Sequence, residues 1–153
     1  ELGINTRSYS AETRAQLKAA IERIVTAEAA ASNSPRPPAF DWNASAPVLV
    51  SDPAATAITL AGFEKEFGAS RLLPLPPLAA SEDVGVFGDF LGVPTVFWFW
   101  GGVAPEVFEA AISAGHLPPT NHSPEFAPVL EPTLTTGVQA MTTAALTWLA
   151  STT

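Results

Sequence analysis

The sequence predicts an α/β fold, because strand-like and helix-like patterns alternate along it. Leu2 and Ile4 alternate with polar residues near the N-terminus, which is the period of a half-buried strand. A long stretch from residue 11 to about 32 is rich in Ala, Glu, Lys and Arg, all strong helix formers. The run "PTVFWFW" (residues 94–100) is apolar on both faces, as expected of an interior strand that helices cover on both sides.

The first 46 residues predict strand, helix, strand. Ser10 is a good N-cap, and Glu12 in the first turn suits the positive end of the helix dipole. One apolar stripe lies at helical spacing, formed by Leu17, Ile21, Ile24 and Val25. The prolines of "SNSPRPP" end this helix, and "AFDWNA" (residues 39–44) predicts the second strand.

The remaining residues predict helices around the aromatic strand. Asp52 followed by Pro53 starts a helix that Gly68 ends, and a short helix is expected over residues 82–91. A further helix spans about residues 105–114, up to Gly115, and the last runs from Pro132 to about residue 150. Its expected inward side chains are Leu134, Val138, Met141, Ala145, Leu146 and Leu149. A domain boundary near Pro47 divides the chain into residues 1–46 and 47–153.

Composition narrows the classes of function. The formal net charge is −8, from 7 basic and 15 acidic residues, which argues against nucleic acid or an anionic membrane as partner. No apolar run approaches the roughly 20 residues that span a bilayer. The chain has no cysteine, which excludes thiolate chemistry but leaves the compartment open. It begins with Glu1 and no signal peptide is visible, so we expect a piece of a longer protein. Its compartment stays unknown, with the cytoplasm favoured.

His122 is the first candidate for chemistry. It lies in the loop "TNHSPEF", which nearby prolines stiffen, and a rigid loop holds an imidazole in one orientation as a metal site requires. On spacing alone, a surface histidine in a turn is the favoured alternative. One histidine is no metal site, since a catalytic zinc commonly takes three protein ligands.

Three further residues have both a structural and a functional interpretation. Glu82, within Ser81-Glu82-Asp83, either belongs to a helix N-terminus or lies near a metal or a substrate amide. Arg7 could bind a substrate carboxylate with two hydrogen bonds, although a surface strand arginine is the simpler interpretation. His116 follows Gly115 and is explained by the helix end. The aromatic run, including Trp98 and Trp100, is expected in the core.

Several segments together resemble a known family. They are "INTRSYSAETRAQLKAAIERIVTAEAAASN", "SDPAAT", "LAASEDVGVFGDFLGVPTVFWFWGG" and "NHSPEFAPVLEPTLTTGVQAMTTAALTWL". In this order they are similar to the C-terminal part of the metal-dependent amidohydrolases. These include hippurate, N-acyl-amino-acid and auxin-conjugate hydrolases, which are related to aminoacylase and the dinuclear-zinc carboxypeptidases. The resemblance covers nearly the whole chain.

The resemblance implies a function and a place for each candidate. Residues 1–46 would end a lid domain that commonly mediates dimers, and residues 47–153 would be the C-terminal α/β part of the catalytic domain. His122 would be the family's last metal ligand, and Glu82 would lie near the site. The metals would be zinc or manganese, and the substrate an N-acyl amino acid of hippurate type. The other ligands and the general base would lie upstream, so the isolated chain is expected to be inactive.

Two alternatives remain open at this point. The parent protein could be an exopeptidase or dipeptidase of the same superfamily, acting on small peptides. The chain could also be a non-enzymatic binding fragment. In each case we expect a homodimer or other self-association, because missing neighbours would leave apolar edges exposed around residues 96–99.

Overall fold

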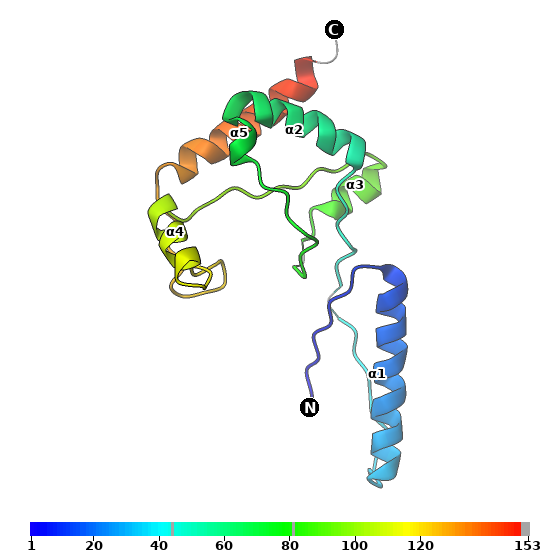
Figure 1. Cartoon of the computed structure of the whole chain (residues 1–153). Helices are drawn as coiled ribbons and strands as arrows, with labels where there is room; N and C mark the ends of the chain where they lie inside the picture. The colour runs from blue at the N-terminus through cyan, green and yellow to red at the C-terminus, as the bar shows by residue number, and fades with distance from the viewer. Residues whose placement is uncertain (44, 81, 151–153) are drawn as a thin grey trace. The chain divides into compact units, whose positions relative to one another are not determined.

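The computed structural model describes the whole chain except residues 44, 81 and 151–153 (Figure 1). The described elements are the helices α1 (Ala11–Ala31), α2 (Pro53–Phe67), α3 (Gly85–Leu91), α4 (Pro105–Ser113) and α5 (Thr133–Leu149), with a short 3-10 turn η1 (Ala69–Arg71). No strand is present among these residues, so the predicted α/β class is wrong. None of the described helices is both long and apolar enough to cross a bilayer.

The three predicted strands fail for a common reason. A period-two pattern favours an extended backbone, but a strand exists only where a neighbour completes the hydrogen-bonded ladder. The segment 96–100 keeps the alternation: Trp98 packs edge-on against Phe63, with ring centroids 5.2 Å apart, while Phe97 and Phe99 pack on each other at 4.9 Å. Nothing in the described chain pairs with it as a strand. Residues 2–7 and the described part of 39–44 likewise form no ladder.

The chain divides into two compact units, which are described separately. Unit 1 consists of Glu1–Asp52 and Pro74–Thr95, and unit 2 of Pro53–Leu73 and Val96–Thr153. Each unit is therefore built from two stretches of sequence. The boundary predicted near Pro47 stays a prediction, as does the assignment of residues 1–46 to a lid and of residues 47–153 to a catalytic part, which rests on the resemblance.

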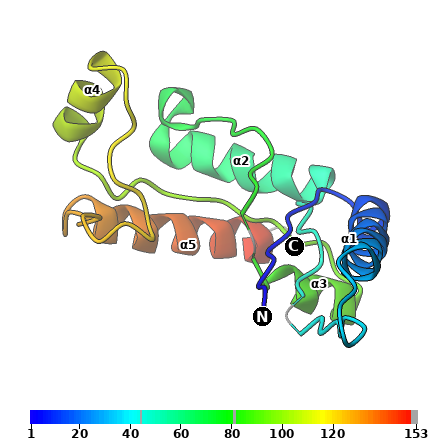
Figure 2. The same cartoon turned by 90° about the horizontal axis from the view of Figure 1, so that it is seen from below.

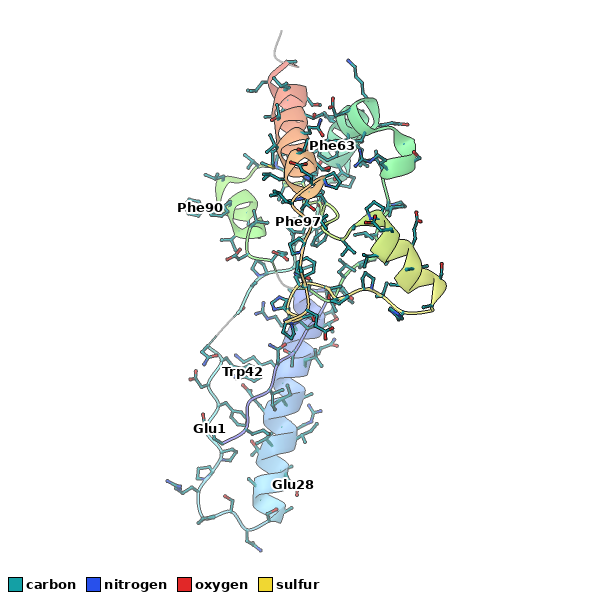
Figure 3. All side chains as sticks on the ribbon, turned by 90° about the vertical axis from the view of Figure 1, so that its left-hand side faces the viewer. Glu1, Glu28, Trp42, Phe63, Phe90 and Phe97 are labelled. Carbon is teal, nitrogen blue, oxygen red and sulfur yellow. The ribbon has the colours of Figure 1, made fainter. Side chains whose placement is uncertain are left out.

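In unit 1, the segment after α1 runs back along that helix. The predicted N-cap is confirmed, since Ser10 Oγ accepts a hydrogen bond of 3.0 Å from the Thr13 amide. Trp42 Nε1 donates to Glu22 Oε1 at 2.8 Å, and Lys18 Nζ lies 4.9 Å from the Trp42 ring centroid (Figure 3). Arg14 donates to the Ala46 carbonyl at 3.1 Å. Since α1 has no buried residue, these polar and cation–π contacts hold the segment in place.

Unit 2 is centred on the packing of α2 against α5, which lie side by side in Figures 1 and 2. Phe63 from α2 packs with Ala140 and Ala144 from α5. The helices approach closely at Gly62, where an added Cβ would lie 2.3 Å from Thr147 Oγ1. Small residues on both helices thus allow their backbones to come close together. Trp98 packs against the core that Phe63, Ala140 and Ala144 form.

The outward side of α5 differs from the prediction. Its large apolar residues were expected to face inward, yet the structure leaves them between 57% and 70% exposed, at Leu134, Val138, Met141, Leu146 and Leu149. The buried residues of this helix are Ala140 and Ala144. The sequence pattern correctly identified an apolar stripe on α5. However, α2 packs against the adjacent face of that helix, where the small residues Ala140 and Ala144 lie. The core prediction for the aromatic run is also wrong at Phe99 and Trp100, which are 50% and 51% exposed.

Candidate functional site

The loop that carries His122 begins at the end of α4. Gly115 has φ 78°, and its amide donates to Ile112 O at 3.0 Å, while the His116 amide donates to Ala111 O at 3.1 Å. These two hydrogen bonds form a Schellman motif, which satisfies the last carbonyls of the helix. His116 Nδ1 lies 3.2 Å from the Leu117 carbonyl. His116 thus caps the helix end with its backbone amide, while its side chain contacts the next residue and no carbonyl of the helix.

His122 has an unusual backbone conformation within a tight turn of the loop. Its φ is 73°, in the left-handed region that few residues other than glycine adopt. The Ser123 amide donates to the Thr120 carbonyl at 3.0 Å and closes a turn in which His122 is the third residue. A positive φ at the third residue is the requirement of a type II turn. Asn, Asp and His tolerate this conformation better than other non-glycine residues, which explains the residue type locally.

A second turn follows at once. The Phe126 amide donates to Ser123 O at 3.1 Å, with Pro124 at the second position, where its fixed φ favours a turn. Ser123 Oγ also accepts from the Glu125 amide at 3.2 Å. Consecutive turns of this kind fix the backbone on both sides of Ser123. The sequence expectation of a stiff loop is thus supported by specific hydrogen bonds.

The far end of the loop is attached at Gly102. The Val129 amide donates to the Gly102 carbonyl at 2.9 Å. A Cβ at Gly102 would lie 3.1 Å from Pro128 Cβ and 3.6 Å from the Phe126 ring. The sequence allows either a sharp turn or a close backbone approach at Gly101-Gly102, and at Gly102 the structure has the close approach, where a larger residue would require Pro128 to shift. The His122 loop is therefore tied both to α4 and to the end of the aromatic segment.

The His122 side chain itself is exposed. An imidazole nitrogen is a common metal ligand, so its position at a fixed turn suits one bond to a metal. In the described part of the chain, however, no three His, Cys, Asp or Glu side chains come close enough together to hold a metal ion.

Glu82 lies in unit 1, just before α3. The helix was expected from residue 82, but it begins at Gly85, with Val84 as N-cap and no side-chain cap. Glu82 and Asp83 thus precede the helix, and the Asp83 carbonyl accepts from the Val86 amide at 3.0 Å. Ser81, the expected cap, lies outside the described residues. Glu82 is half-buried and Asp83 is exposed.

Arg7 also lies in unit 1, exposed in the extended N-terminal segment. Arg7 and Glu82 share a unit, and His122 belongs to unit 2. A site that includes all three residues remains a prediction of the resemblance.

A surface groove in unit 2 was missed by sequence reasoning. It has a volume of about 610 Å³, and its walls come from the aromatic segment, the end of the His122 loop and α5. The lining is uncharged and mostly apolar: Trp100, Pro128, Val129, Leu130, Thr133, Leu134, Gly137, Val138, Met141 and Thr142. The available signal was that α5 contains no charged residue over 17 positions. A solvated helix rarely has this composition.

No protein-family model matches this chain.

Proposed function

We propose that this chain is the C-terminal part of a metal-dependent amidohydrolase that cleaves the amide bond of N-acyl amino acids. His122 would contribute one ligand to a site with two divalent metal ions, zinc or manganese. The remaining ligands and the general base would come from other parts of the protein. The resemblance of the four quoted segments, in their order, is the origin of this proposal.

The observation that carries it is the geometry of His122. His122 takes φ 73° as the third residue of a closed turn, and a second closed turn follows it directly. The turns hold the backbone while the imidazole stays exposed. A ligand must reach its metal in one orientation, and neighbouring structure usually fixes that orientation.

The chemistry would be divided between metals and protein. Two divalent ions, when bound, would supply Lewis acidity toward a water molecule and the scissile carbonyl. His122 would hold one ion in place through its turn. A glutamate outside this chain would take the proton of the water and deliver it to the leaving amine. Glu82 would orient a residue that contacts the metal ligands. Arg7 would bind the substrate carboxylate with two hydrogen bonds.

The isolated chain is expected to lack activity. Among the described residues, no three His, Cys, Asp or Glu side chains lie close enough together to supply the three protein ligands that a catalytic zinc commonly takes. We expect no hippurate turnover above buffer when the 153-residue chain is incubated with zinc or manganese. Measurable benzoate release would contradict the division of the site between this chain and other segments.

The decisive experiment uses the longest open reading frame that contains this chain. We expect an upstream His-x-Asp motif and an adjacent pair of glutamates, and release of benzoate from hippurate by the expressed product. Release of amino acids from dipeptides without benzoate release would favour the exopeptidase alternative. An open reading frame without these motifs, and a product without bound metal, would overturn the proposal in favour of a non-enzymatic role.

A further inference from the structure

The proline-rich stretch after η1 has no role in the proposed metal site. It reads "RLLPLPP" and spans residues 71–77, which we call the proline segment. Proline fixes its own φ at about −65°, and the residue before a proline is restricted to an extended backbone. Leu73, Leu75 and Pro76 each precede a proline. The sequence therefore favours the polyproline II conformation over residues 73–77.

The structure is consistent with this conformation. Residues 72–78 form no helix, strand, turn or bend. Leu72 has φ −99° and ψ 119°, so the backbone is extended from the first residue after η1. The residues of the proline segment are consecutive, so their spacing follows from the chain itself and not from the placement of the two units. The proline segment is therefore extended within the folded chain.

All residues of the proline segment except Leu72 are exposed. Leu73 and Leu75 are 76% and 58% exposed, whereas Leu72 packs against the core of unit 2. A polyproline II helix has about three residues per turn, so Pro74 and Pro77 share one edge, and Leu72 lies on another. The edge that carries both prolines is therefore exposed.

One hydrogen bond of the proline segment shows which kind of donor suits it. The Tyr9 hydroxyl donates to the Pro77 carbonyl at 3.4 Å. Proline has no N–H, so its carbonyl is the only polar group that it offers. O–H···O hydrogen bonds are commonly about 2.7–2.8 Å long, and Tyr9 is 60% exposed. The contact is thus long and accessible, and a hydroxyl or indole N–H of a partner can replace it.

A second stretch of the chain has two prolines at the same spacing but lacks these properties. It covers residues 35–38 in unit 1. Its first two residues form a bend, and the Ser34 hydroxyl donates to the Arg36 carbonyl at 2.8 Å. Ser32 stands three positions before its first proline, where the proline segment has Arg71. The two stretches therefore differ in backbone shape and in the position of the charge, and the second serves as an internal control.

Arg71 places a positive charge at one end of the proline segment. It is exposed, and its guanidinium lies 5.6 Å from the centroid of the Phe67 ring. An aromatic ring attracts a cation without neutralising it, so Arg71 can still pair with a carboxylate. The charge stands three residues, or about one polyproline II turn, before Pro74. A partner with an acidic site one turn from its proline-binding groove is therefore complementary to the proline segment.

We propose that the proline segment docks into a domain of the SH3 class that has an acidic site beside its groove. Grooves of this class are lined with aromatic side chains and bind PxxP segments in the polyproline II conformation. Pro74 and Pro77 pack between the aromatic rings, and Arg71 pairs with the acidic site. Because the prolines fix the backbone before binding, the segment loses little conformational entropy when it docks. The inference does not rest on the proposed hydrolase function, because neither His122 nor Glu82 takes part in the contact.

The test is the titration of the full 153-residue chain into a panel of purified SH3 domains labelled with nitrogen-15, observed by NMR. We expect saturable shifts of the groove resonances in domains that have an acidic site. Pro74→Ala and Pro77→Ala should each raise the dissociation constant at least about tenfold, because each removes apolar surface from the groove. Pro38→Ala, in the second stretch, should leave the constant within about twofold. Arg71→Gln should raise it about threefold and remove most of its dependence on salt.

The absence of saturable shifts with every domain of the panel, at chain concentrations up to about 1 mM, would overturn the inference. So would binding that Pro38→Ala weakens as much as Pro74→Ala, because the contact would then not be specific to the proline segment. An unchanged dissociation constant and salt dependence in Arg71→Gln would exclude the acidic site, and with it the proposed partner. Binding to purified WW domains, without binding to any SH3 domain, would assign the segment to another class of partner. Circular dichroism at 222 nm checks that each variant retains the helix content of the parent chain.

Discussion

The hydroxyl of Thr59 offers a sharp test of how α2 and α5 are held together. Thr59 is 2% exposed, and its Oγ1 accepts a hydrogen bond of 3.1 Å from Trp148 Nε1. The same hydroxyl donates to the Ala55 carbonyl at 2.9 Å. The variant Thr59→Val keeps the shape and the β-branched side chain, and therefore the helix propensity, but removes both hydrogen bonds.

The expected loss follows from these two contacts. A buried hydrogen bond contributes about 1 kcal/mol, and a donor left without a partner costs a further 1–3 kcal/mol when it is fully buried. Trp148 is 40% exposed, so water can partly replace the lost acceptor. The hydrogen bond to Ala55 is local to the helix and contributes little. We therefore expect Thr59→Val to lower the free energy of unfolding by about 1–2 kcal/mol.

Thr56→Val is the matched control. Thr56 lies one turn earlier on the same helix, and its buried Oγ1 has no hydrogen-bond partner in the described part of the chain. Replacing an unpaired hydroxyl by a methyl group should be neutral or stabilise by up to about 1 kcal/mol. Urea unfolding followed by circular dichroism measures both variants. Equal stability of Thr59→Val and Thr56→Val would refute the assigned role of the Trp148–Thr59 hydrogen bond.

Two further predictions address local structure. Gly62→Ala should destabilise unit 2 by about 1 kcal/mol, because the contact of its Cβ with Thr147 Oγ1, at 2.3 Å, outweighs the helix propensity of about 1 kcal/mol that Ala gains over Gly. Gly3→Ala, where nothing lies within 4 Å of the added Cβ, serves as its control in the same urea titration, and equal midpoints would contradict the close contact. Ser10→Ala should cost about 1 kcal/mol through loss of the α1 N-cap. Amide hydrogen exchange should become faster in the first turn of α1, and unchanged protection at Thr13 would argue against the Ser10 hydrogen bond.

The helices could be predicted from the sequence because their signals are local. Ser10 and the prolines after residue 34 delimit α1, and Asp52-Pro53 and Gly68 delimit α2. Gly68 has the expected positive φ of 82°, and its amide donates to Glu64 O at 2.9 Å. Each of these signals acts within one turn of the chain, so it needs no knowledge of tertiary neighbours.

The strands could not be predicted reliably, because a sheet depends on distant partners. The run at residues 96–100 has the alternation and the apolar composition of an interior strand, and its odd and even side chains do lie in different aromatic contacts. What is absent from the described chain is a neighbouring strand. The same limit explains the error at α5. The sequence pattern identified its apolar stripe, but it could not show that α2 packs on the face formed by Ala140 and Ala144, which leaves the stripe exposed.

For the candidate site too, the sequence predicted some features of the His122 loop and of the segment before α3 and missed others. The prolines around His122 indicated a stiff loop. The double glycine after the aromatic run indicated either a sharp turn or a close backbone approach, and the structure has the close approach, at Gly102 beside Pro128. The positive φ of His122 was not anticipated, although the residue type allows it. The beginning of α3 at Gly85 was missed, because acidic residues before a helix resemble those in its first turn.

The most direct test of the proposed function is the metal content of the full-length gene product with His122 replaced by Ala, measured beside hippurate turnover. We predict that the parent protein binds about two divalent ions per chain, and that His122→Ala loses one of them together with at least about 100-fold in activity, as is expected when a metal ligand is removed. His116→Ala, at the end of α4, should retain both ions and activity. Full metal content and unchanged turnover in His122→Ala would contradict the account.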